Sequence, residues 1–330
     1  MRILLDAMGS DKHPQPEVDA AIQATDEFGD ELTLVGNRDM LLPMLGKHAS
    51  RIEVIHADDV FEMTDKISAR SLRKVQNSLG VSMDLIKSGD ADALVTAGNT
   101  GGAMAIALAR LGRLKGVRRP GLTALFPVKD GFSVVLDIGA NTECKPEYLL
   151  QFALMGAVYA ELVLGVDNPR VGLLSIGEEA GKGNELVRAT YPLLENSGLN
   201  FIGNIEGKEL FGGEVDVTVT DGFTGNVLMK GVEAVAKLIT ERLREEIMAS
   251  PISQLGGLLV RPAFRALQKD LDPREVGAAP LLGLNGLVFV GHGRSDDKAI
   301  LSAIRLARQS VEVGLLESLG RSVESALGKS

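Results

Sequence analysis

Glycine, asparagine and threonine are concentrated at residues 97–102, where an apolar run gives way to Ala-Gly-Asn-Thr-Gly-Gly and then to a small-residue helical pattern. Glycines let backbone N–H groups approach a ligand closely. The N-terminus of the next helix offers unpaired N–H donors and the positive end of a dipole. This stretch therefore predicts a site for a small anion such as phosphate, although Gly-Asn is also common in ordinary turns.

Five other loops share this composition and also follow apolar runs: residues 6–11, 139–142, 177–184, 220–226 and 291–296. Ligands of open parallel sheets bind outside the carboxyl ends of the strands, so we expect the six loops to converge on one site. None of the loops matches the P-loop or the dinucleotide-binding fingerprint. The expected anion is therefore small, or is presented by another molecule.

The chain shows no clear sequence motif for a catalytic nucleophile. Cys144 is the single cysteine and fits a small buried hydrophobe, and no G-x-S-x-G elbow occurs. The four histidines lack metal-ligand spacing. Only His292 lies on a candidate loop, where it could be an acid/base group or a structural residue. Lys182 lies between two glycines, where it would neutralise phosphate or simply be solvated. Five aspartates flank the loops as site residues or helix caps: Asp6, Asp11, Asp137, Asp221 and Asp296.

Short apolar runs typical of buried parallel strands recur along the chain: residues 3–5, 32–35, 54–55, 93–95, 122–126, 134–138, 171–176, 201–202, 215–219 and 287–290. Helical patterns lie between most of them: residues 16–28, 68–88, 102–114, 147–164, 183–196, 225–248 and 298–327. This alternation predicts an α/β fold, three-layered αβα with a mostly parallel sheet. We expect residues 1–330 to form a single catalytic unit with two lobes around a cleft.

Composition limits the function classes. The chain has 330 residues, a net charge of −9 and one cysteine. The acidic balance argues against nucleic-acid binding, and the cysteine count favours a reducing compartment. No apolar run reaches the ~18 residues of a membrane span. We expect a cytoplasmic enzyme with no metal and no cofactor.

Residues 251–276 break the alternation, because they are helical but contain two glycines and a proline, and no strand follows directly. We expect residues 245–276 to form a protruding helical hairpin. Its apolar and basic positions could pack on the body or a second subunit, or could contact a membrane surface or a partner: Leu255, Leu258, Leu259, Arg261, Arg265 and Lys269.

Motifs along nearly the whole chain resemble the PlsX family, the phosphate acyltransferases of bacterial phospholipid synthesis. They are DAMGSD at 6–11, AGNTGG at 97–102, ALFP at 124–127, LDIGAN at 136–141, NPRVGLLSIGEE at 168–179, KGN at 182–184, FIGNIEG at 201–207, TDGFTGNV at 220–227, APLLGLNG at 279–286 and GHG at 291–293. One departure is Ser10, which stands at the second glycine of a motif that usually reads DAMGGD.

The resemblance implies transfer of a long-chain acyl group from acyl carrier protein to inorganic phosphate. The acyl phosphate then feeds a membrane acyltransferase that acylates glycerol 3-phosphate. It also implies a homodimer, peripheral membrane association, and a fold similar to phosphotransacetylases and isocitrate/isopropylmalate dehydrogenases. Direct attack of phosphate on the thioester would need no enzyme nucleophile.

Within this reaction we assign catalytic roles to Lys182, Asn226 and His292, the last as a proton donor to the thiolate. We expect nine residues to contact phosphate or substrate: Asp6, Gly98, Asn99, Thr100, Gly101, Asn141, Asn184, Asp221 and Thr224. Of these, Asp6 and Asp221 are expected to orient the other groups.

An acidic enzyme needs local basic surface to meet an acidic carrier protein. The first choice has five cations within ten residues and no acid: Arg110, Arg113, Lys115, Arg118 and Arg119. The second is Lys66, Arg70, Arg73 and Lys74. Either cluster could instead be a solvated helix face.

Three other functions remain open. A short-chain phosphotransacetylase using coenzyme A would share the fold. A metal- and nicotinamide-dependent dehydrogenase would need clustered acids, whereas these loops are richer in Asn, Thr and Gly. A membrane-docking scaffold built on the basic hairpin would not need six such loops.

Overall fold

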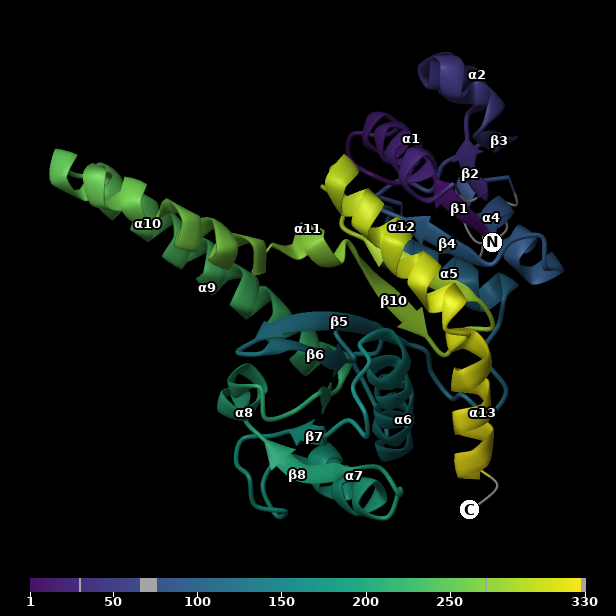
Figure 1. The fold of residues 1–330 in the computed structure, drawn as a ribbon. Coiled ribbons are helices and arrows are strands. Elements are labelled where there is room, and N and C mark those ends of the chain that lie inside the picture. The colour runs from purple at the N-terminus through teal and green to yellow at the C-terminus, as the bar shows by residue number, and fades with distance from the viewer. Residues whose placement is uncertain (30, 66–75, 271, 328–330) are drawn as a thin grey trace.

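The computed structural model describes residues 1–29, 31–65, 76–270 and 272–327, and shows a mixed α/β fold built on one large sheet (Figure 1). The sheet has eleven strands in the order β3-β2-β1-β4-β11-β10-β5-β6-β9-β7-β8. The strands are β1 Arg2–Asp6, β2 Glu31–Gly36, β3 Glu53–His56, β4 Ala93–Thr96, β5 Gly121–Val128, β6 Gly131–Leu136, β7 Val171–Leu174, β8 Phe201–Ile205, β9 Val217–Val219, β10 Ala278–Leu282 and β11 Leu287–Gly291.

Helices connect most of these strands. They are α1 Gln15–Phe28, α2 Arg38–Leu45, the short 3-10 helix η1 Gly46–Ser50, α4 Ser78–Ser88, α5 Thr100–Arg110, α6 Pro146–Val163, α7 Glu185–Glu195, α8 Gly207–Gly212, α9 Gly222–Met248, α10 Pro251–Asp270, α11 Pro273–Val276, α12 Asp297–Glu312 and α13 Leu315–Leu327.

The sheet contains two parallel sets of strands that run in opposite directions. β3, β2, β1, β4 and β11 are parallel to one another, as are β6, β9, β7 and β8. Between the sets, each of the pairs β11–β10, β10–β5 and β5–β6 is antiparallel. The carboxyl ends of the two sets therefore lie at opposite edges of the sheet, which corrects the expectation that all six loops leave equivalent strand ends.

Successive strand residues point to opposite faces of the sheet, and this divides the core in two. Leu5, Val95 and Leu136 pack in a cluster with residues of α1, α6, α7, α12 and α13. Leu4 and Leu94 pack on the other face with residues of α4, α5, α8 and α9. The fold therefore has three layers, with the sheet between two layers of helices.

One predicted helix differs from the structure, and some elements of the structure were not predicted. The helix expected over 298–327 is divided at Gly314, whose φ of 64° a side-chain-bearing residue rarely adopts. β10 follows 251–276 directly, where no strand was expected, because it is a short antiparallel strand that opens Ala-Ala-Pro. α2 contains Pro43 and α8 has six residues, so neither gives a clear helical period.

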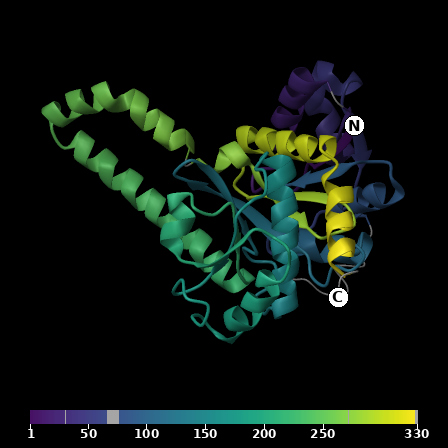
Figure 2. The ribbon, with the colours of Figure 1, turned by 60° about the horizontal axis from the view of Figure 1, so that its bottom comes forward.

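α9 and α10 project together from the body (Figures 1 and 2). α9 has 27 residues, so it is about 40 Å long. α10 returns alongside it. Gly257 lies so close to α9 that an added Cβ would stand 2.6 Å from the Cγ2 of Ile247. α9 itself begins at Gly222, against the Asn141 carbonyl in the body.

Candidate active site

Hydrogen bonds connect the end of β1 to the loop after β4, which contains the Ala-Gly-Asn-Thr-Gly-Gly stretch. Asp6 is buried and accepts a hydrogen bond of 2.7 Å from the Thr96 hydroxyl, which in turn accepts one of 3.0 Å from the Gly98 N–H. Burial raises the pKa of Asp6, against the opposing effect of bonds from Ser78, Thr96 and the Met8 N–H. Asp6 is therefore linked through Thr96 to the Gly98 N–H of the loop after β4.

Asn99 caps α5 and anchors its loop. Its Oδ1 accepts from the Gly102 N–H at 2.9 Å, and its Nδ2 donates to the carbonyl of Met63 at 2.9 Å. The first N–H groups of a helix have no partner within it, and Asn99 takes only that of Gly102. Within the described part of the chain, the N–H groups of Thr100 and Gly101 and the exposed Thr100 hydroxyl remain free to donate hydrogen bonds.

The loop after β11 meets these two loops. Asp11 N–H donates to the Gly293 carbonyl at 2.7 Å. His292 is half-exposed, and its Nε2 lies 3.6 Å from a carboxylate oxygen of Glu233 on α9. The structure thus brings together His292, Asp6 and residues 98–101 at one edge of the sheet.

A second buried carboxyl, which the sequence did not single out, supports the first loop. Glu17 on α1 is fully buried, and its Oε1 accepts from the Ser10 N–H at 3.1 Å. Its Oε2 and the Ser10 hydroxyl have no hydrogen-bond partner in the described residues. Ser10 has no left-handed φ, so a glycine is not required there. Burial is the main cause that raises the pKa of Glu17, and the nearby Asp6 also raises it.

We expect Glu17→Gln to stabilise the protein increasingly as pH rises. A raised pKa means that the folded state binds the proton more tightly, so wild-type stability falls as pH increases above 4.5 and through the folded pKa. The neutral amide removes this loss, so the stability of the variant relative to wild type should rise with pH across this range. Denaturant unfolding from pH 4 to pH 8 measures it, with the exposed Glu31→Gln as control. A stability difference that does not change with pH would contradict the assignment.

The loops after β6 and β9 meet at the opposite edge of the sheet. Asp137 is fully buried, and five donors bind its carboxylate. Oδ1 accepts from the N–H groups of Leu122, Gly139 and Ala140 at 3.1, 3.0 and 2.9 Å, and Oδ2 accepts from the N–H and Nδ2 of Asn141 at 2.7 and 2.8 Å. These N–H groups are thus already occupied. Burial nevertheless raises the pKa of Asp137, against the effect of those donors.

α9 begins directly against this loop. Gly222 N–H donates to the Asn141 carbonyl at 2.8 Å, and a Cβ on Gly225 would stand 2.0 Å from the Asp137 carbonyl oxygen. Glycine is therefore the residue that fits this approach. Asp221 caps the helix, accepting from the N–H groups of Phe223 and Thr224 and from the Thr224 hydroxyl.

Asn226 lies one turn further along α9, over Gly139. Its Nδ2 would be 3.4 Å from a Cβ on Gly139, and its Oδ1 is buried without a partner in the described part of the chain. Asn226 and Asn141 are therefore in one loop cluster, whereas Asp221 and Thr224 are engaged in capping the helix.

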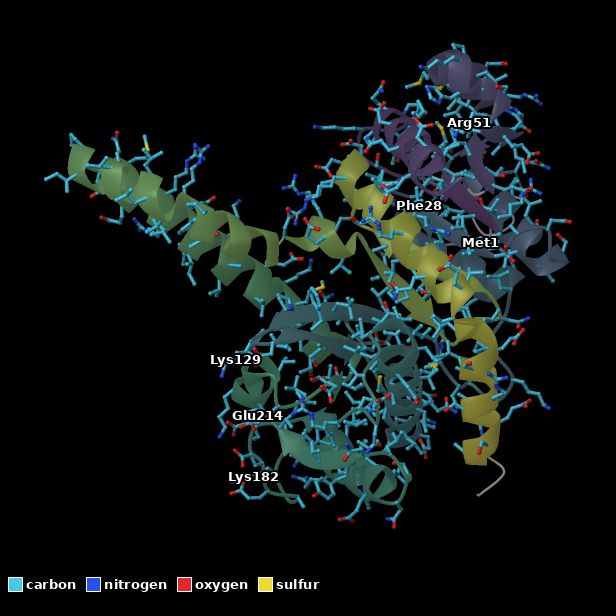
Figure 3. All side chains as sticks on the ribbon, in the orientation of Figure 1. Met1, Phe28, Arg51, Lys129, Lys182 and Glu214 are labelled. Atoms are coloured by element: carbon cyan, nitrogen blue, oxygen red, sulfur yellow. The ribbon has the colours of Figure 1, made fainter. Side chains whose placement is uncertain are left out.

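Lys182 and Asn184 lie on the third loop of this edge, after β7. Asn184 caps α7 by accepting from the Val187 N–H at 2.9 Å. The Lys182 side chain is exposed, and Figure 3 places it near the β7–β8 end of the sheet, on the other side of the molecule from Met1. The structure does not join Lys182 to residues 97–102.

Cys144 follows the Asp137 loop and donates weakly to the Asn141 carbonyl at 3.4 Å. Burial raises the pKa of its thiol to about 12, with a smaller contribution from the charge of Asp137. A thiol with this pKa carries almost no thiolate at neutral pH, so Cys144 is poorly suited to be a nucleophile.

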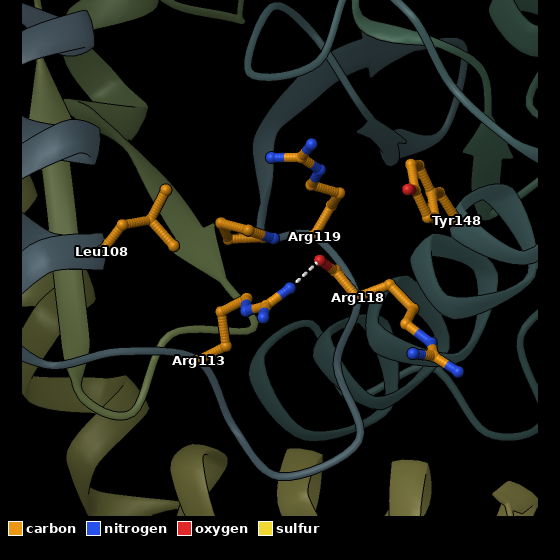
Figure 4. Close-up of a pocket in the computed structure, with 6 residues that line it drawn as sticks. Leu108, Arg113, Arg118, Arg119 and Tyr148 are labelled. Atoms are coloured by element: carbon orange, nitrogen blue, oxygen red, sulfur yellow. Dashed lines mark hydrogen bonds between the residues drawn. The ribbon is translucent and has the colours of Figure 1, made fainter.

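In the basic stretch 110–119, two cations form ion pairs and three line a pocket. Arg110 lies 3.1 Å from Asp84 and Lys115 lies 3.2 Å from Glu324. Arg113, Arg118 and Arg119 line a pocket of about 430 Å³ together with Leu108, Pro120 and Tyr148 (Figure 4). Lys66, Arg70, Arg73 and Lys74 lie outside the described residues.

The predicted site residues thus form separate groups. Residues 98–101 with Asp6 and His292 lie at one edge, and Asn141, Asp221, Thr224 and Asn226 lie at the other, with Lys182 and Asn184 on a third loop. Glu17 and Thr96 were missed because buried polar positions in a helix and a strand carry no motif of their own. Among the described residues, no three His, Cys, Asp or Glu side chains are grouped so that they could hold a metal.

Solved α/β enzymes share the fold of this chain. A phosphotransacetylase from Streptococcus pyogenes superposes with a TM-score of 0.66 at 17% identity, over 94% of this chain and 94% of that one. A putative 4-hydroxythreonine-4-phosphate dehydrogenase from Salmonella typhimurium superposes with a TM-score of 0.54 at 14% identity, over 94% and 99%. At such identities the likeness defines the fold alone, and it confirms the expected phosphotransacetylase-like architecture.

Sequence comparison gives the family. The model of the fatty acid synthesis protein family matches residues 1–318. A phosphate acyltransferase of Geobacter sulfurreducens is 46% identical over 98% of this chain and 95% of its own. Another from Desulfitobacterium hafniense is 44% identical over 97% and 96%. The chain belongs to this family, which confirms the PlsX resemblance, and it is an acyltransferase.

Proposed function

We propose that this acyltransferase moves a long-chain fatty acyl group from acyl carrier protein to inorganic phosphate, and that the acyl phosphate serves phospholipid (phosphatidic acid) synthesis. The observation that carries the proposal is the 44–47% identity, over nearly the whole chain, to relatives named phosphate acyltransferase. The N–H donors at the start of α5 fit a free anion, which supports phosphate as the acceptor.

The reaction proceeds by direct attack. A phosphate oxygen bonds to the thioester carbonyl carbon, the carbon–sulfur bond breaks, and the thiolate leaves as a thiol after receiving the proton that hydrogen phosphate gives up. Acceleration comes from placing the two substrates together and from stabilising the oxyanion. The high pKa of Cys144 supports a route without a covalent enzyme intermediate.

In this proposal Thr100, Gly101 and Asn99 hold phosphate, and His292 passes the proton to the leaving thiolate. Lys182, Asn184 and Asn226 stabilise charge from the opposite edge of the sheet. The proposal requires that the two strand sets act as two lobes around a cleft, and that closure on the substrates brings their loops together. Asp6 and Asp221 orient the loops, since both bond to backbone or neighbouring side chains.

Replacing Lys182 by alanine should lower kcat/KM for phosphate by about 10- to 100-fold, because a charge-assisted hydrogen bond is worth about 1.5–3 kcal/mol. Its exposed loop position means that folding should be unaffected. Steady-state kinetics at varied phosphate measures the loss, and the exposed Lys129→Ala serves as control. An unchanged kcat/KM would remove Lys182 from the site.

The acyl donor is proposed to be a carrier protein, docked at Arg110, Arg113, Lys115, Arg118 and Arg119. Carrier proteins of this class are acidic, and opposite charges steer encounter. Arg118 and Arg119 support this role because their side chains are exposed and no acidic partner lies near them in the described residues.

The α9–α10 arm is proposed to serve a homodimer, an anionic membrane surface, or both. Ile252, Leu255, Leu258 and Leu259 lie exposed near its tip, between 61% and 85% accessible, with Arg261 beside them. The side chains of Arg265 and Lys269 lie outside the described part. No described helix has the length and apolarity needed to cross a bilayer, so the proposed contact is peripheral. It would hold a cytoplasmic enzyme near the membrane glycerol-3-phosphate acyltransferase that consumes acyl phosphate.

A second candidate is transfer of a short acyl group between coenzyme A and phosphate. The superposition on the Streptococcus pyogenes phosphotransacetylase favours it. A docking scaffold without catalysis is set aside, because the family is one of acyltransferases.

Product identity and the absence of an acyl-enzyme test the chemistry. Incubation with radiolabelled long-chain acyl carrier protein and phosphate should give acyl phosphate, trapped as a hydroxamate, with no label on the denatured enzyme. Label that stays on the protein and chases into product would show a covalent intermediate and overturn direct attack.

A further inference from the structure

The pocket beside residues 112–120 is held by side chains from two other elements. The buried Gln151 of α6 accepts from the Arg118 N–H at 2.7 Å and donates to the Gly116 carbonyl at 2.9 Å. Asn141 donates to the Pro120 carbonyl at 2.7 Å. Arg113 donates to the Arg118 carbonyl (Figure 4). The arginine-bearing turn is therefore positioned before any ligand arrives.

The lining combines positive charge with apolar surface. Arg113, Arg118 and Arg119 supply guanidinium groups, whereas Leu108 and Pro120 supply hydrocarbon. Guanidinium groups bind phosphoryl oxygens through paired N–H donors. A water molecule takes up about 30 Å³, so a pocket of about 430 Å³ has space for more than a single phosphate ion. Its chemistry and size fit a phosphorylated organic chain.

α5 connects this pocket to the proposed phosphate loop. Leu108 lies in the pocket, and Thr100 begins the same helix at the other edge of the sheet. Eight residues of helix span about 12 Å, which an extended chain of about four residue lengths covers. α5 and α9 pack on the same face of the sheet. A ligand chain that lies along α5 on that face would start among the arginines and end near Thr100.

We propose that Arg113, Arg118 and Arg119 bind the phosphoryl group of the phosphopantetheine arm that carries the acyl thioester. The inference rests on the proposed function and assigns this pocket to the arm of the donor and not to the attacking phosphate. The arm, with two amide groups between its phosphate and its sulfur, then directs the thioester along α5. The backbone beside Arg119 is tied to the Asp137 loop, since Asn141 donates to the Pro120 carbonyl.

Two matched donors test the assignment: long-chain acyl thioesters of pantetheine and of phosphopantetheine, which differ only in the phosphoryl group. Wild type should prefer the phosphorylated donor by about 10- to 100-fold in kcat/KM. Arg118→Gln with Arg119→Gln should bring this ratio close to one. Arg242→Gln, an exposed arginine on α9, should retain the wild-type ratio.

Binding of free phosphopantetheine, measured by titration calorimetry, tests the pocket without turnover. Wild type should bind it more tightly than pantetheine, and the double variant should lose the difference. A wild-type ratio near one, or a ratio that the double variant keeps, overturns the assignment. A rise in KM for inorganic phosphate with the donor ratio intact also overturns it, because the pocket would then hold the acceptor. Binding without acyl phosphate formation from any donor would instead count against the proposed function.

Discussion

Asp137→Ala should lower the free energy of unfolding by about 3–5 kcal/mol and reduce kcat/KM by at least about 100-fold. Asp137 is the acceptor for four backbone N–H groups and the Asn141 amide, all around a carboxylate that solvent does not reach. A buried donor left without an acceptor costs about 1–3 kcal/mol. Loss of the loop would also release Asn141 from Pro120 and Gly222 from Asn141.

Asp137→Asn separates the effect of side-chain shape from that of hydrogen bonding. Asparagine has the same shape and keeps one acceptor oxygen, but its NH₂ group would face backbone N–H groups. It should be destabilising, though less so than alanine, and Asp130→Ala in the exposed β5–β6 turn is the matched control. Denaturant unfolding and steady-state kinetics on the same preparations measure both effects. Near-wild-type stability of Asp137→Ala would mean that the loop is not organised by this carboxylate.

Leu258→Asp with Leu259→Asp should weaken binding to anionic vesicles by at least about 100-fold. These side chains are 61% and 77% exposed on α10, and each buried leucine contributes about 1.5–3 kcal/mol to transfer out of water. The two carboxylates would also be repelled by anionic headgroups. Vesicle flotation measures the partition coefficient, and turnover with a water-soluble donor should be retained.

Met40→Asp is the matched control, because Met40 is similarly apolar and 44% exposed but lies on α2. Its vesicle binding should equal that of wild type. If the α10 variant floats like wild type but sediments as a monomer where wild type is a dimer, then this apolar surface serves the partner subunit and not the membrane.

Most helices and strands could be predicted from the sequence because apolar runs and helical periods are local. The reversal between the strand sets could not, because it depends on β10 and β5 pairing antiparallel across the middle of the sheet. The apolar run from Val134 to Leu136 would be the same whether β6 is parallel or antiparallel to β1, so it does not give the direction of the strand. For this reason the six loops were expected at one edge.

The site residues show a similar division. Asn99 and Asp6 could be singled out because they follow strands in glycine-rich motifs; in the structure Asn99 accepts from the Gly102 N–H and Asp6 accepts from the Thr96 hydroxyl. The N–H groups of Gly139 and Ala140 look equally available in sequence but are bound by Asp137. For the cluster at 110–119, the sequence shows only that the stretch is strongly basic. Which cations are paired and which line a pocket depends on Asp84, Glu324 and Gln151, all remote in the chain.

The central claim is best tested by the specificity of the purified enzyme for its acyl donor. With inorganic phosphate as acceptor, kcat/KM for a long-chain acyl carrier protein should exceed that for acetyl-CoA by at least about 100-fold, and acyl phosphate should form in equal amount to free carrier thiol. Turnover of acetyl-CoA with no acyl phosphate from the carrier-bound donor would contradict the account and identify a short-chain phosphotransacetylase.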